Sequence, residues 1–207
     1  MRKYLVEFIG TFFLVLVIGM VVLGGIGNFA SLGIGATLMV MIYAGGHISG
    51  AHYNPAVTLA VLIRGRINAT DAIAYMIVQI LGAVAAAYLV TYFYDKLPEV
   101  VPRTNNFRAI VAEFVGTFAL AYVVLNVATS KDTAGNSYYG LAIGFTVLAM
   151  AYAFGAISGG AFNPAVAVGI CIMQIAGWTD IWIYLLGCFA GGLVAGVIFR
   201  FLNPGDK

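Results

Sequence analysis

Charged residues are scarce in this chain. Only 9% of its 207 residues are Asp, Glu, Lys or Arg, whereas 62% are hydrophobic. A water-soluble domain carries roughly a quarter charged residues, so the composition excludes an ordinary soluble domain and places most of the chain in lipid. The net charge is only +2 and the basic residues are scattered. A nucleic-acid-binding protein, which concentrates basic residues on one face, is therefore a poor match.

Cysteine and histidine are also rare, with two of each. Cys171 and Cys188 lie in apolar runs without a Cys-x-x-Cys spacing, which predicts small packing residues rather than redox or metal groups. His47 and His52 lie just before the segment Asn54-Pro55-Ala56. The second half of the chain has alanines, Ala156 and Ala161, at the equivalent positions. We interpret the histidines as groups that fix a loop by hydrogen bonds. No metal set and no nucleophile–base pair is present, so we expect no metal, no cofactor and no enzymatic activity.

One motif occurs twice. The segment Ser49–Val57 reads SGAHYNPAV, and Ser158–Val166 reads SGGAFNPAV 109 residues later. Near the start of each half, the run from Glu7 (EFIGTF) is matched by the run from Glu113 (EFVGTF). Self-similarity at a long period indicates a duplicated unit. We therefore predict a single transmembrane domain, 1–207, made of repeat 1 (1–93), a connecting loop (94–108) and repeat 2 (109–207).

Hydrophobic stretches that can cross a bilayer need about 20 residues as a helix. We expect six such helices, at 4–24, 32–48, 71–93, 109–129, 138–156 and 180–202. Two further apolar segments, 54–64 and 163–175, are too short to cross, and each begins with Asn-Pro. Because Asn is a preferred helix cap and Pro suits the first helical position, these segments read as half-helices. The predicted fold class is an all-α membrane protein with six transmembrane helices and two re-entrant half-helices.

Three spans in each repeat place the second repeat upside down relative to the first. Inverted repeats bring equivalent broken helices together near the middle of the membrane, so we expect Asn54-Pro55-Ala56 to meet Asn163-Pro164-Ala165. Irregular backbone at that depth is tolerated only inside protein or beside a watery cavity. The positive ends of the half-helices would repel cations, while the two Asn amides donate to neutral oxygens.

Basic residues predict the orientation. With both termini in the cytoplasm, seven basic residues lie inside (Arg2, Lys3, Arg64, Arg66, Lys131, Arg200 and Lys207) and three outside (Lys96, Arg103 and Arg108). This distribution fits the positive-inside rule. We expect an integral protein of the plasma or inner membrane whose first hydrophobic segment is a retained span. The loop 94–108, which contains Pro98 and Pro102, would then lie outside.

Glu7 and Glu113 are acidic residues inside predicted spans, where a charge is costly and needs a partner. We expect each carboxylate to accept hydrogen bonds from backbone N–H groups of the re-entrant loop in its own repeat, as a structural support. The alternative is a proton relay of a coupled transporter. Tyr43 and Tyr152 are equivalent in the two repeats, and we interpret them as packing residues rather than a gate.

These features together resemble the aquaporin, or major intrinsic protein, family over nearly the whole chain. The resemblance implies an hourglass fold, a passive pore in each protomer and a homotetramer. It also implies a second constriction, whose four positions fall on Ile34, Ala151, Gly160 and Val166. The sequence departs from the family pattern here, because Val166 replaces an arginine, Ala151 the histidine of water-selective members, and Ile34 a large aromatic residue.

Four apolar positions predict a wide ring with few hydrogen-bond donors. We therefore expect a channel for water that also admits small uncharged solutes such as glycerol, urea, ammonia or hydrogen peroxide. If Tyr152, Phe162 or the loop 94–108 fills the ring, the channel is strictly water-selective. A secondary transporter also uses inverted repeats, but it would need charged coupling groups at the midplane. A membrane-junction scaffold with an inactive pore is a further alternative.

Overall fold

The computed structural model describes residues 1–101 and 105–206. The predicted loop residues Pro102 and Arg103, and the predicted cytoplasmic Lys207, lie outside this range. The described residues form eight α-helices: α1 (Arg2–Leu23), α2 (Ala30–Ser49), α3 (Pro55–Arg64), α4 (Ala69–Phe93), α5 (Asn106–Ala128), α6 (Tyr139–Ser158), α7 (Pro164–Ile172) and α8 (Ile181–Leu202).

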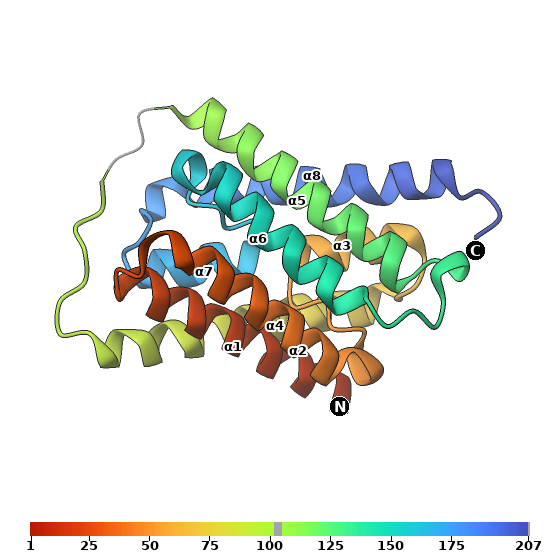
Figure 1. The fold of residues 1–207 in the computed structure, drawn as a ribbon, viewed down its shortest axis with the longest axis horizontal. Helices are drawn as coiled ribbons and strands as arrows, with labels where there is room; N and C mark the ends of the chain where they lie inside the picture. The colour runs from red at the N-terminus through yellow and green to blue at the C-terminus, as the bar shows by residue number, and fades with distance from the viewer. Residues whose placement is uncertain (102–104, 207) are drawn as a thin grey trace.

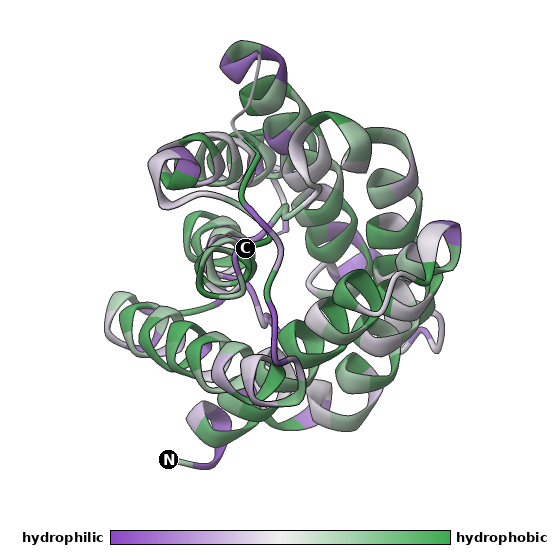
Figure 2. Cartoon of the chain, turned by 90° about the vertical axis from the view of Figure 1, so that its left-hand side faces the viewer, coloured by the Kyte–Doolittle hydropathy of each residue, from purple (hydrophilic) through white to green (hydrophobic). Residues whose placement is uncertain are grey.

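Six of these helices are long and apolar enough to cross a membrane: α1, α2, α4, α5, α6 and α8. Each begins and ends within three residues of a span expected from the sequence. The remaining two, α3 and α7, are the expected half-helices. Large hydrophobic side chains such as Phe13, Leu81, Leu186 and Val197 are exposed on the outside of the bundle. Figure 2, which views the molecule along its length, shows hydrophobic residues predominating along the helices.

Asparagine residues cap the N-terminal ends of α4 and α5. The side-chain oxygens of Asn68 and Asn105 accept hydrogen bonds from the N–H groups of Asp71 and Arg108, and so cap α4 and α5. Such caps satisfy one of the N–H groups that a helix start leaves without a partner. Local sequence therefore fixes where these spans begin.

The predicted end of the second half-helix was wrong. The sequence predicted helix to residue 175, but α7 ends at Ile172. The backbone of Gln174 is left-handed, with φ 56°, and the N–H groups of Ile175 and Ala176 both donate to the carbonyl of Ile170. This turn is normally made by glycine. A glutamine in its place gave no signal for the end of the helix.

Each half-helix packs on the other repeat. Within the repeats, α1 contacts α2 and α4, and α5 contacts α6 and α8. Between them, α3 packs against α8 and α5, whereas α7 packs against α4 and α1. Figure 1 shows both chain ends at one end of the bundle and the α4–α5 connection at the other. The exchange places both half-helices inside the molecule.

Glycines allow the helices to approach closely. A Cβ atom at Gly187 or Gly191 would lie 2.9 or 2.6 Å from a carbonyl oxygen of α5, and one at Gly196 would lie 3.1 Å from the Ala60 oxygen of α3. Gly192 also packs directly on α3, against Ala56. The small-residue spacing in α8 therefore serves packing within one chain.

Replacing Gly191 by alanine is expected to destabilise the protein by about 1–3 kcal/mol, because the added methyl group overlaps the α5 backbone. The overlap is with Phe114 O at 2.6 Å and Phe118 N at 2.8 Å. Gly33 is the matched control, since a Cβ there would meet only a Val21 side-chain carbon at 3.5 Å. Thermal unfolding in detergent measures both variants. Equal stability of the two would contradict the packing described for α5 and α8.

Candidate functional site

Two loops, residues 50–53 and 159–162, lead into the half-helices with the same unusual backbone. Left-handed φ angles occur at Gly50, Ala51 and Tyr53, and again at Gly159, Gly160 and Phe162. Non-glycine residues rarely adopt this conformation, and it persists only where the surroundings enforce it. The enforcement comes from hydrogen bonds to two buried carboxylates.

Glu7 of α1 holds the first loop. Its fully buried carboxylate accepts hydrogen bonds from the backbone N–H groups of His52 (2.9 Å) and Tyr53 (2.7 Å), the hydroxyl of Ser49 (2.7 Å) and the amide of Gln79 (2.8 Å). The expected bonds between this acid and the loop of its own repeat are therefore present. Four donors distribute the negative charge and fix the loop in place.

Glu113 of α5 holds the second loop in the same way. It accepts hydrogen bonds from Ala161 N (3.0 Å), Phe162 N (2.6 Å) and the Ser158 hydroxyl (2.6 Å). The position equivalent to Gln79 is Cys188, whose Sγ lies 3.5 Å from the carboxylate. The prediction for Cys188 was thus incomplete, because this thiol also donates a weak hydrogen bond.

The two Asn-Pro turns are tied to each other. The Asn54 side-chain nitrogen donates to the carbonyl of Phe162 (2.8 Å), and that of Asn163 donates to the carbonyl of Tyr53 (2.9 Å). Each Asn oxygen caps its own half-helix. An amide carries two N–H donors, so one N–H of each Asn remains for a molecule in the adjoining space.

Carbonyl oxygens supply the complementary groups. The N–H groups of Gly50 and Gly159 donate to carbonyls of the preceding helices, and the other loop N–H groups donate to Glu7, Glu113 and two serines. In contrast, the carbonyls of residues 50–52 and 159–161 accept no hydrogen bond from the described part of the chain. A buried carbonyl without a protein partner is normally hydrated. These loops therefore present acceptors to water.

A cavity of about 420 Å³ adjoins both turns, at the end of the molecule that carries the α4–α5 connection. Its wall includes Asn54 and Asn163 together with all four positions of the expected constriction, Ile34, Ala151, Gly160 and Val166. Within the described residues, no Asp, Glu, Lys or Arg lines it. We call it the outer cavity. Its polar groups are amides, carbonyls and a few uncharged side chains.

A second cavity, of about 1010 Å³, opens toward the end where the termini lie, and we call it the inner cavity. Its wall carries charged groups, including Lys3, Arg66, Asp71 and Lys131. The two cavities share four wall residues, Ile42, His52, Val124 and Ile143. Because these four residues line both cavities, the cavities adjoin. Together they extend from one end of the bundle to the other.

The aromatic residues that could narrow the outer cavity differ in position. Phe162 is 1% exposed and packs beneath Gly116, away from the cavity wall. No described residue of the loop 94–108 lines the cavity. Tyr152 does line it and is 51% exposed. Its equivalent, Tyr43, donates to the carbonyl of Ser137 (3.1 Å) and so joins α2 to the start of α6.

The two histidines also differ. His52 Nδ1 lies 3.1 Å from the hydroxyl of Thr58, in agreement with the expected loop-fixing hydrogen bond, and its ring also contacts Tyr75. His47 is exposed on the wall of the inner cavity and makes no hydrogen bond with the described residues. His52 therefore belongs to the loop scaffold, whereas the expectation for His47 was wrong.

Sequence reasoning missed further members of the site. Tyr75 and Tyr184 donate hydrogen bonds to the carbonyls of Ser49 and Ser158, at 2.8 and 2.9 Å. The tyrosines are 109 residues apart, as are the serines. This common offset was the signal that could have found them. No such signal marked the ion pair between Arg64 and Asp206, because neither residue has an equivalent partner in the other repeat.

Comparisons with known proteins agree with this geometry. The family model for major intrinsic proteins matches residues 1–199. Glycerol uptake facilitator protein-like 6 of Lactiplantibacillus plantarum is 36% identical, with both chains fully covered. Aquaporin NIP1-1 of Zea mays is 36% identical over 98% of this chain and 76% of its own length.

The fold is also similar to that of a solved structure. The X-ray structure of the aquaglyceroporin from Plasmodium falciparum matches with a TM-score of 0.84 and 22% identity, covering 98% of this chain and 97% of that one. At that identity the match concerns the fold alone. The family match and the sequence relatives establish more: this chain is an integral membrane protein that belongs to the major intrinsic protein family.

Proposed function

We propose that the chain is a passive channel for water and for small uncharged solutes such as glycerol, urea, ammonia or hydrogen peroxide. The observation that carries this proposal is the pair of adjoining cavities beside two half-helices that are tied together through Asn54 and Asn163. The names of the relatives, a glycerol uptake facilitator and an aquaporin, support it.

The geometry performs this task through matched polar groups. A passing oxygen accepts a hydrogen bond from the remaining N–H of Asn54 or Asn163, while its hydrogens are donated to the loop carbonyls. The N-terminal ends of α3 and α7, begun by Pro55-Ala56 and Pro164-Ala165, each carry a partial positive charge. Two such ends facing each other repel hydronium and metal cations but do not repel neutral molecules.

We assign the constriction to Ile34, Ala151, Gly160 and Val166. Its support is that all four line one cavity whose wall has no charged side chain among the described residues. Without an arginine, the ring lacks a fixed charge and its rigid array of donors. A wide and largely apolar ring suits the carbon backbone of small polyols. Tyr152, on the same wall, favours the narrower alternative of a strictly water-selective channel.

The buried acids do not suit a coupled transporter. Glu7 and Glu113 each accept hydrogen bonds from their own loop, and neither lines the outer or the inner cavity. A coupling group would have to reach the passage in order to bind and release an ion. We therefore assign these acids a structural role, and the proposed activity involves no enzymatic step.

The proposed setting follows from charge and from the family. We place both termini in the cytoplasm, in a plasma or inner membrane, because Lys3, Arg66 and Lys131 line the inner cavity and Arg64 binds Asp206 near the C-terminus. Residues 1–207 then form one channel domain of two inverted repeats, 1–93 and 109–207. We propose a homotetramer by analogy with the family.

Stopped-flow measurements on proteoliposomes test the proposal. Osmotic water flux should rise linearly with the gradient, with a lower activation energy than in protein-free vesicles, and glycerol should follow. Flux should not depend on sodium, potassium or a proton gradient. Saturable flux that requires an ion would overturn the channel and favour a transporter.

A further inference from the structure

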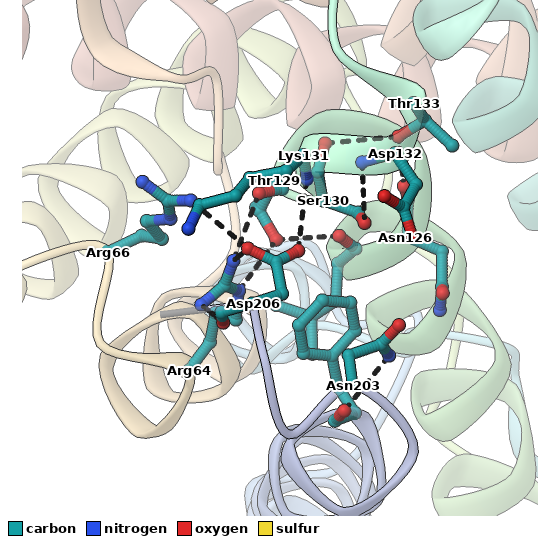
Figure 3. Close-up of polar contacts among 12 residues, drawn as sticks. Arg64, Arg66, Asn126, Thr129, Ser130, Lys131, Asp132, Thr133, Asn203 and Asp206 are labelled. Carbon is teal, nitrogen blue, oxygen red and sulfur yellow. Dashed lines mark hydrogen bonds and ion pairs between the residues drawn. The ribbon is translucent and has the colours of Figure 1, made fainter.

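The chain segment that follows α8 turns back onto the bundle, and its Asp206 meets Arg64 at the end of α3 (Figure 3). The Arg64 guanidinium donates to the Asp206 side-chain Oδ1 at 2.6 Å and to its backbone oxygen at 2.7 Å. The Arg64 side chain is only 1% exposed. A charge buried to this degree needs a partner, and Asp206 provides it.

Arg64 also holds the end of α5. It donates to the hydroxyl and to the carbonyl of Thr129, at 3.3 and 3.2 Å, and its guanidinium lies 4.7 Å from the centre of the Phe199 ring in α8. One guanidinium therefore joins a half-helix, the last span and the start of the α5–α6 connection. Planar, multidentate binding of this kind is characteristic of arginine and is not reproduced by lysine.

Asp206 completes the link. Its Oδ2 accepts a hydrogen bond from the backbone N–H of Lys131 at 3.0 Å, and Arg66 lies 3.4 Å from Oδ1. The Lys131 N–H lowers the pKa of Asp206 to about 2, with smaller contributions from Ser130 and Arg64. The carboxylate therefore stays ionised at neutral pH, and the link is not a sensor of physiological pH.

The connection that this link holds forms part of the inner cavity. Its residues Thr129, Ser130, Lys131, Thr133 and Asn136 line the cavity wall. Within the connection, the contacts are local: Thr133 donates to the carbonyl of Asn126 and Asn136 donates to that of Val127. These local bonds shape the turn, while Asp206 and Arg64 determine where its first residues lie relative to α3.

We propose that Asp206 and Arg64 are positioning residues for permeation, which hold the 129–136 connection at the rim of the inner cavity and keep that mouth wide. This inference rests on the proposed channel function. Release of the link lets the connection move over the mouth, so flux of water and of solutes falls together. A residue at the constriction would instead change the ratio of the two.

Asp206→Asn tests the inference, because it removes the charge at constant size. Asp132→Asn is the matched control: it removes the same charge from the same connection, but the Asp132 side chain takes no part in the Arg64 link. In detergent, we expect tryptic cleavage after Lys131 to accelerate about tenfold in Asp206→Asn, as expected for a released local segment. Water and glycerol flux per channel should both fall at least about threefold. Asp206→Glu should restore most of both.

The outcomes are distinguishable. Absence of flux in the wild-type protein would refute the channel function itself. Wild-type flux together with identical cleavage and flux in Asp206→Asn and Asp132→Asn would overturn the positioning role. Faster cleavage with unchanged flux would also overturn it, because the link would then hold the connection without affecting permeation.

Discussion

Replacing Val166 by arginine is expected to lower glycerol and urea permeability about tenfold, which corresponds to ~1.4 kcal/mol in the barrier, and to lower water permeability less. Val166 lies in the first turn of α7 on the wall of the outer cavity. A guanidinium there adds bulk, a fixed charge and a rigid set of donors to the proposed ring, whose other members are Ile34, Ala151 and Gly160. Solutes larger than water lose more space than water does.

The control is Val166→Leu, which adds volume without charge. It should reduce glycerol flux modestly and leave the water-to-glycerol ratio closer to that of the wild-type protein. Stopped-flow swelling with each solute, normalised to the number of channels, measures all three proteins. Equal losses of water and glycerol flux in Val166→Arg, or no loss of either, would contradict the wide, uncharged ring.

Replacing Glu7 by alanine is expected to prevent accumulation of folded protein. The carboxylate accepts four hydrogen bonds, including those of the His52 and Tyr53 N–H groups. Each buried donor left without a partner costs about 1–3 kcal/mol, so the two backbone N–H groups alone account for at least ~2 kcal/mol. Their loss also removes two of the hydrogen bonds that hold the loop with the left-handed backbone at Ala51 and Tyr53.

Folded yield after gel filtration and thermal unfolding in detergent measure this effect. Glu113→Ala should behave alike, because its carboxylate holds the second loop with the same geometry. Glu99→Ala is the control, since Glu99 is exposed in the α4–α5 connection, and it should be close to wild type. A stable Glu7→Ala protein with normal flux would show that the acid is not the support described above.

Much of the fold was predictable because the chain contains two similar repeats, so that each feature of one half could be checked in the other. The spans follow from the length of the hydrophobic stretches, and the half-helix starts follow from Asn54-Pro55 and Asn163-Pro164. The bonds between each acid and the loop of its own repeat follow from the cost of a charge inside a span. These signals are local, or become visible by comparison of one half with the other. The end of α7 was missed because Gln174, rather than a glycine, adopts the left-handed turn.

Contacts that join distant segments without a repeat were not predictable. Each Asn amide donates to a carbonyl in the opposite loop. Because every residue has a backbone carbonyl, the sequence does not show which carbonyl accepts such a bond. The residue run 203–206, Asn-Pro-Gly-Asp, reads only as a turn, and nothing local identifies Arg64 as the partner of Asp206. The positions of the proposed constriction came from the family resemblance, but the sequence did not show that Phe162 would pack against Gly116 while Tyr152 would line the outer cavity.

The most direct test of a wet passage beside the paired half-helices is the block of a Val166→Cys channel by a small, water-soluble mercurial. The native cysteines, Cys171 and Cys188, are both buried, so the wild-type protein supplies the background, and Leu186→Cys on the exposed outer face of α8 is the control. We predict that labelled Val166→Cys loses most of its water flux and regains it with a thiol reductant, while labelled Leu186→Cys keeps its flux. Full labelling of Cys at position 166 with unchanged water flux would contradict the account, because water would then cross the protein by another route.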